Sequence, residues 1–178
     1  MHDFEVVEKD VRAPLTRFAW SFDGSGAVQG TALFQVLDDD RHPDAKLGRD
    51  GNRTVSSLYD LKTASKDKRA NRIGDFNNAY VIAKGTKVEH WLNGRLVVSY
   101  DRGTDEFRAL VAKSKYADPK YGKNFGEWAD GHILLQEHGD EVWFKNVKLR
   151  DLAPKPAAKP AAKGGKKAPA KKIGRAHV

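Results

Sequence analysis

The stretch of sequence that decides the fold is VEHWLNGRLVVSY, residues 88–100. Two runs rich in β-branched and aromatic residues flank the dipeptide Asn93-Gly94. Asn-Gly supplies the two positive φ angles of a type I′ turn, whose twist matches that of antiparallel strands. The stretch therefore predicts a β-hairpin with strands at 86–92 and 95–100.

Other short runs of the same kind continue the pattern on both sides, with turn residues between them. Many short strands at such spacing are typical of an all-β sandwich. One short helix is expected at 105–112, where Thr104 is the candidate N-cap and Phe107 begins an apolar face. The further strands are expected at 4–12, 17–22, 31–37, 54–59, 77–84, 131–137 and 141–149.

Composition divides the chain of 178 residues into a body and a tail. Residues 153–178 contain eight basic residues and no acidic one, so the net charge of +8 belongs to them and the body, 1–152, is neutral. Residues 153–172 are Lys, Ala, Pro and Gly, and we expect them to be disordered. The last six, 173–178, match the translation of a sequencing-adapter oligonucleotide and are interpreted as an artefact. Nucleic acid is therefore expected to bind only non-specifically, through the tail.

The run GHILLQEHG, residues 131–139, carries unusual chemistry for a strand. Side chains alternate along a strand, so His132 and Gln136 should share one face while Ile133 and Leu135 share the other. His138 follows at the turn. We expect the apolar face to pack and the polar face to line a cleft. His132 can equally be a hydrogen-bonded core histidine and His138 a loop residue.

Several segments together resemble the 3-keto-disaccharide hydrolase domain family, also described as 3-keto-alpha-glucoside 1,2-lyase/3-keto-2-hydroxy-glucal hydratase. The resemblance covers about residues 3–152. It implies a concanavalin A-like lectin/glucanase β-sandwich (a jelly roll) that has lost its N-terminal strand. The segments are FQVLDD (34–39), RHPDAKLG (41–48), GNRT (51–54), SLYDL (57–61), VEHWLNG (88–94), SKY (114–116), GHILLQEHG (131–139) and VWFKNV (142–147).

The resemblance implies an enzyme that cleaves 3-keto-glycosides in the periplasm or outside the cell. A ketone at carbon 3 acidifies the hydrogen on carbon 2, so a base can start an elimination that expels the group on carbon 1, and water then adds. The base needs a pKa near neutrality, which suits His132 or His138. Lys115 is the candidate cation for the enolate oxygen. It can also be an ordinary surface lysine.

Five residues are candidate sugar ligands, and three of them have a plainer alternative. Asp38 could simply cap the turn that follows its strand. His90 has Val88 and Leu92 as neighbours on its face, a pattern more typical of a core histidine. Tyr59 could pack. The five candidates are Gln35, Asp38, Tyr59, His90 and Gln136.

Two further possibilities stay open at the level of sequence. The histidines, with Gln and carboxylates, could hold a divalent metal ion that polarises the ketone. Leu33 stands where members of the resembled family usually have Glu, which favours a non-catalytic carbohydrate-binding module as the alternative function.

Overall fold

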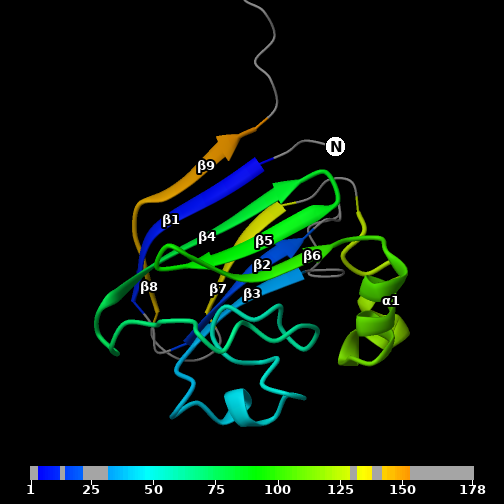
Figure 1. Ribbon diagram of the computed structural model, residues 1–178, viewed down its shortest axis with the longest axis horizontal. Coiled ribbons are helices and arrows are strands. Elements are labelled where there is room, and N and C mark those ends of the chain that lie inside the picture. Colours follow the sequence, from blue (N-terminus) through cyan, green and yellow to red (C-terminus); the bar gives the residue numbers. More distant parts are fainter. Residues whose placement is uncertain (1–3, 13–14, 22–31, 129–131, 138–141, 153–178) are drawn as a thin grey trace, which may run out of the picture.

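The computed structural model describes residues 4–12, 15–21, 32–128, 132–137 and 142–152. Two antiparallel sheets make up this part of the chain (Figure 1). The strands are β1 (Phe4–Arg12), β2 (Leu15–Ser21), β3 (Ala32–Leu37), β4 (Phe76–Lys84), β5 (Lys87–Leu92), β6 (Arg95–Asp101), β7 (His132–Glu137), β8 (Trp143–Phe144) and β9 (Val147–Asp151). The helix α1 spans Asp105–Ala112, and short 3₁₀ helices occupy η1 (Pro43–Lys46), η2 (Lys115–Ala117) and η3 (Pro119–Tyr121).

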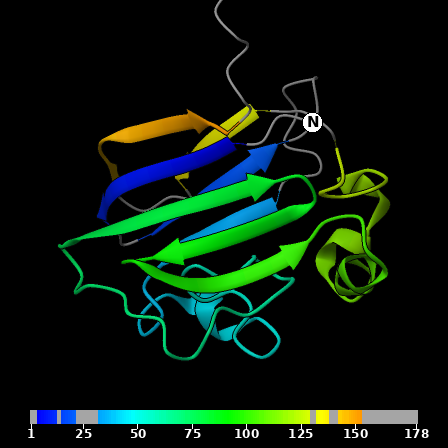
Figure 2. The ribbon, with the colours of Figure 1, turned by 45° about the horizontal axis from the view of Figure 1, so that its top comes forward.

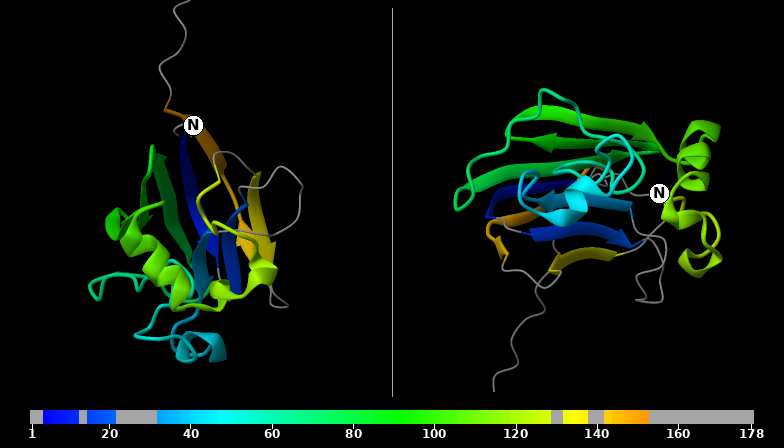
Figure 3. Two further views of the ribbon diagram at one scale, coloured as in Figure 1. Left: turned by 90° about the vertical axis from the view of Figure 1, so that its right-hand side faces the viewer. Right: turned by 90° about the horizontal axis from the view of Figure 1, so that it is seen from below.

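The larger sheet has the order β6-β5-β4-β1-β8, and β9 also pairs with β1. The smaller sheet has the order β3-β2-β7. Figure 3 shows the two as separate layers, with α1 at one end of them. The loops between β3 and β4 lie along the open edge of β3, where Phe34 forms an isolated bridge with Leu58 (Figure 2). These loops carry Asp38 and Tyr59, and the segment after α1 carries Lys115.

The core lies where the two sheets face each other. Phe34 on β3 meets His90 on β5, with ring centroids 5.1 Å apart, and both are completely buried. β4 and β5 alternate buried and partly exposed residues along their length. This period of two means that one face of each strand packs inward.

The predicted hairpin and helix are both confirmed. Asn93 and Gly94 have φ angles of 48° and 79°, as the type I′ turn requires. The helix begins after Thr104, whose hydroxyl accepts a hydrogen bond from the Phe107 N–H. Phe107 is the buried residue of α1, so the apolar face was also predicted correctly.

Two expectations about the strands were wrong. Residues 54–59 form turns rather than a strand, with Ser56 in the left-handed region at φ 64° and only the bridge at Leu58. The strand expected at 141–149 is divided into β8 and β9 at Asn146, whose φ is 57°. The apolar face of β7 is only partly covered by the described part of the chain, since Ile133 and Leu135 are 38% and 42% exposed.

Candidate functional site

The register of the smaller sheet brings two of the predicted glutamines into one row. Gln35 on β3 pairs with Arg17 on β2, which pairs with Gln136 on β7. His132 pairs with Ser21 at the start of β7, five residues from the strand's end at Glu137. At about 3.3 Å per residue, that separation is about 17 Å. At His132 and Gln136 the backbone alone is described, and His138 lies outside the described residues.

Gln35 is anchored through its backbone and sealed from solvent. Its N–H donates to the Ser57 carbonyl, and its own carbonyl accepts from the Ser56 N–H. The residue is 1% exposed, and its Oε1 accepts no hydrogen bond from the described part of the chain. An unpaired buried amide oxygen costs free energy, so a hydrogen-bond donor placed beside Gln35 Oε1 would be stabilised.

Tyr59 and Lys115 come together although 56 residues separate them in sequence. The Lys115 ammonium lies 4.4 Å from the centroid of the Tyr59 ring and 5.2 Å from that of Tyr116. Tyr59 is buried and Lys115 is partly exposed. A cation over the face of an aromatic ring is attracted by the ring's negative quadrupole. The arrangement therefore holds a positive charge at a fixed place at the surface.

A carboxylate network lies directly beside this pair. Arg53 donates from Nε to Asp60 Oδ1 at 2.8 Å and from Nη1 to Asp44 Oδ1 at 2.9 Å. Burial alone would lower the pKa of the Arg53 guanidinium. The bonds to Asp60 and Asp44 outweigh that effect and raise the pKa above its ordinary value. The positive charge of Arg53 is therefore compensated by the carboxylates of Asp44 and Asp60.

Asp38 caps the turn that follows its strand, as the plainer alternative predicted. Its Oδ1 accepts from the N–H groups of Asp40 and Arg41, at 2.9 and 3.3 Å, and so caps the turn after β3. It also lines a cavity of about 620 Å³ between the ends of the two sheets. Phe34 and Leu92 line the apolar part of that cavity, and of the predicted site residues Asp38 alone is among its lining residues.

His90 is placed in the core and not at a surface. It is 0% exposed, lies between the rings of Phe34 and Tyr100, and its Nδ1 is 3.0 Å from the Ser56 carbonyl oxygen. A carbonyl oxygen only accepts, so Nδ1 carries a proton. Burial lowers the pKa of His90 to about 4, although the bond to Ser56 opposes the shift. In this structure a sugar has no route to that ring.

The pKa of His90 predicts a loss of stability on acidification. An unfolded His90 takes up a proton below about pH 6.5, whereas the buried ring does so only near pH 4. The contribution is therefore complete above pH 6.5, is lost as the pH falls from 6.5 to 4, and changes no further below that. The loss amounts to about 3 kcal/mol. Urea unfolding at pH 7.5 and 4.5 measures it, and His90→Asn, which can still donate to Ser56 but does not titrate, should show a smaller pH dependence. Equal pH dependence in both proteins would contradict the assignment.

Comparison with known proteins places the chain in a family. The sequence pattern of the 3-keto-alpha-glucoside-1,2-lyase-like domain matches residues 19–150. The chain belongs to this family. A curated 3-keto-disaccharide hydrolase of Bacteroides thetaiotaomicron is 38% identical over 126 residues. The match covers 67% of this chain and 43% of that protein, so the chain spans less than half of its relative's length.

Two crystal structures from Parabacteroides distasonis share the fold of this family member. Both are of proteins whose assignment as glycosyl hydrolases is itself inferred. One has a TM-score of 0.67 at 24% identity and covers 85% of this chain and 70% of its own. The other has a TM-score of 0.63 at 23% identity and covers 84% and 78%. At these identities the likeness concerns the arrangement of the strands.

Sequence reasoning gave no role to Arg53 and Asp60 of this 3-keto-alpha-glucoside-1,2-lyase-like domain. Both lie inside segments that were recognised, GNRT (51–54) and SLYDL (57–61). The available signal was an acidic residue in an otherwise apolar run, since a buried carboxylate needs a partner. Which residue would be that partner depends on how the loops fold.

The described residues contain no group of three or more His, Asp or Glu side chains arranged to hold a metal ion. His138 and the side chain of His132 lie outside that search, so the metal stays a prediction. Within the same part of the chain, no helix is long and apolar enough to span a membrane.

Proposed function

We propose that this chain is the catalytic domain of an enzyme that cleaves 3-keto-glycosides. Membership of the family supports this assignment, as does the 38% identity with a protein named a 3-keto-disaccharide hydrolase. The two sheets are those of a concanavalin A-like jelly roll, and the substrate binds on the smaller sheet beneath the loops that carry Tyr59 and Lys115. The sugar is the partner that this site recognises.

The reaction is an elimination followed by a hydration. A base removes the proton from carbon 2, and the negative charge moves onto the oxygen at carbon 3. The enolate collapses to a double bond between carbons 1 and 2, and the alkoxide that leaves carbon 1 is protonated. Water then adds its hydroxyl to carbon 1 and its proton to carbon 2, which regenerates the ketone. The net result is hydrolysis, and it needs a base, an acid and an oxyanion stabiliser.

The single observation that carries this proposal is the Lys115 ammonium held at 4.4 Å from the Tyr59 ring. The enolate needs a positive charge that is already in place before the charge develops, since reorganisation during the reaction would raise the barrier. Lys115 is partly exposed and so accessible to a ligand. Arg53, the other cation over Tyr59, is occupied by Asp44 and Asp60.

We propose His132 or His138 as the base. His132 begins β7, and Glu137, which precedes His138, ends it about 17 Å away, so the two histidines cannot both reach carbons 1 and 2 of one sugar. The test incubates the protein with a 3-keto-disaccharide and follows release of 3-ketoglucose. Of His132→Ala and His138→Ala, made separately, the variant that loses the base should lower the rate by about 10²- to 10⁴-fold. A wild-type rate equal to that of both variants would end the proposal. Repeating the assay after chelation decides whether a divalent metal takes part.

Leu33 supports a second candidate, a carbohydrate-binding module without catalysis. Leu33 stands on β3 two positions before Gln35, where the family usually places Glu. An apolar side chain there cannot transfer a proton. Calorimetric titration with 3-keto-disaccharides and their parent sugars distinguishes the two candidates. Binding without turnover favours the module, and a Leu33→Glu variant that gains turnover would show that Leu33 alone blocks catalysis.

A further inference from the structure

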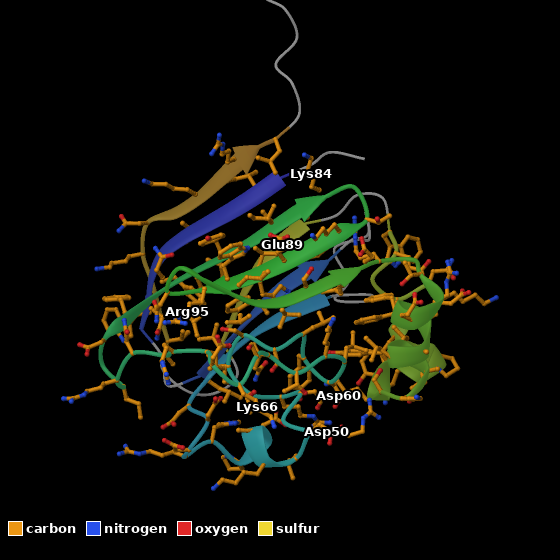
Figure 4. The ribbon with its side chains drawn as sticks, in the orientation of Figure 1. Asp50, Asp60, Lys66, Lys84, Glu89 and Arg95 are labelled. Carbon is orange, nitrogen blue, oxygen red and sulfur yellow. The ribbon has the colours of Figure 1, made fainter. Side chains whose placement is uncertain are left out.

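The carboxylate of Asp60 joins two segments that are distant in sequence. Its Oδ1 accepts from Arg53 Nε, and its Oδ2 accepts from the backbone N–H of Lys115, both at 2.8 Å. Asp60 is only 8% exposed and lies on the side of the loops that faces α1 (Figure 4). One buried carboxylate therefore ties the loop after β3 to the start of η2.

The hydrogen bond from the Lys115 N–H to Asp60 fixes the backbone position from which the Lys115 side chain extends. Tyr59 is the residue next to Asp60 in the chain, so the same carboxylate is anchored beside the aromatic ring and bonded to the backbone of the lysine. The ammonium then reaches its position 4.4 Å from the Tyr59 centroid. Without the bond, the start of η2 would lose its link to Asp60, and the distance between ring and cation would no longer be fixed.

Arg53 orients Asp60 through the bond from its Nε. A buried carboxylate without a partner would be strongly unfavourable, and the Arg53 guanidinium supplies the compensating charge. Asp44 holds the other side of the same guanidinium at 2.9 Å. Asp44 thus shares the ion pair with Asp60, and the Lys115 N–H donates to Asp60.

We propose that Asp60 is a positioning residue, which fixes the Lys115 ammonium over Tyr59 so that it can stabilise the enolate. The proposal rests on the function proposed above for Lys115. Asp60 acts through Lys115 and does not touch the substrate. Its loss should therefore affect the transition state more than substrate binding, and kcat more than KM.

Asp60→Asn is the sharpest test because it changes charge and not shape. Asp60 has a φ of 61°, a left-handed conformation that Asn adopts as readily as Asp. The Asn amide can accept through one oxygen only, and its NH₂ group would face a second donor, either Arg53 or Lys115. One of the two bonds must be lost, and it can be the one to Arg53. Asp60→Gly, which adopts the same φ and removes both acceptors, is therefore measured as well. Asp44→Asn is the matched control, because it weakens the same guanidinium pair and leaves the bond between Asp60 and the Lys115 N–H in place.

The position of Lys115 can be read without any assay of activity. Protons near the face of an aromatic ring resonate upfield, so the Lys115 Hε signals should be shifted relative to those of other lysines. Tyr59→Leu identifies them. In Asp60→Asn they should move toward ordinary lysine values, while kcat on a 3-keto-disaccharide falls at least tenfold and KM changes less than threefold. Asp44→Asn should change neither readout.

Unchanged Lys115 signals in both Asp60→Asn and Asp60→Gly would overturn the proposal, and so would equal effects of Asp60→Gly and Asp44→Asn. If the wild type releases no 3-ketoglucose, the proposed function fails, and the NMR comparison still decides whether Asp60 positions Lys115. If Asp60→Asn does not fold, the comparison uses Asp60→Gly alone, and signals that stay in place there would overturn the proposal.

Discussion

Replacing Lys115 with methionine is expected to lower kcat/KM for a 3-keto-disaccharide by about 10²- to 10³-fold. Methionine keeps the apolar stem but removes the charge, so the enolate loses the cation held over Tyr59. Removal of one preorganised oxyanion stabiliser has this size of effect, about 3–4 kcal/mol in the barrier. The measurement is the initial rate of 3-ketoglucose release at several substrate concentrations.

Lys113→Met is the control for this experiment. Lys113 is exposed and lies two residues earlier, after the end of α1. It has the same charge, so a general effect of net charge would lower the rate in both variants. If Lys115→Met were as active as the wild type, or Lys113→Met equally impaired, the role assigned to Lys115 would be wrong.

Replacing Phe107 with alanine is expected to cost about 3–5 kcal/mol of unfolding free energy, the usual cost of emptying an aromatic core site. Phe107 is 1% exposed and stacks on Tyr100 with ring centroids 5.7 Å apart. It anchors α1, the helix that leads to Lys115. Urea unfolding measures the change, and Glu106→Ala, an exposed neighbour in α1, should stay within about 0.5 kcal/mol of the wild type.

Gly126 offers an independent check on that packing. A Cβ added there would lie 2.8 Å from Phe107 Cζ, and its φ of 74° would also be strained. Gly126→Ala should therefore destabilise the wild type, and by less when Phe107 is already alanine, because the clash is gone and only the strain remains. Fully additive effects would show that the two residues do not touch.

Local rules were enough where a few neighbouring residues determine the structure. The Asn93-Gly94 turn and the Thr104 cap depend on φ preference and on one side-chain bond, and both were predicted from the sequence. Residues 54–59 look like a strand because they include β-branched and aromatic residues. They fold as turns, in which the Ser57 N–H donates to the Thr54 carbonyl, and Ser56 and Ser57 bond to Gln35 on β3, a partner that no local pattern reveals.

The candidate site was harder to predict for the same reason. Tyr59 and Lys115 were both singled out, but their contact depends on Asp60, which joins two loops across 55 positions. His90 shows the opposite case. It shares a strand face with Val88 and Leu92, which indicated a core residue, and its exposure of 0% confirms that prediction. Residue type suggested the chemistry, whereas long-range hydrogen bonds determine which groups meet.

The position of β1 has a consequence for the order in which the protein can assemble during synthesis. Phe4 pairs with Ala83 on one side and with Asp151 on the other. The ribosome therefore delivers β1 well before either of its neighbours. The β5–β6 hairpin can form as soon as it emerges, whereas β1 must wait with its hydrogen-bonding groups unsatisfied, and such non-local pairing is slow. Chaperones that shield exposed strands should thus bind nascent chains of this protein until about residue 151 has left the exit tunnel.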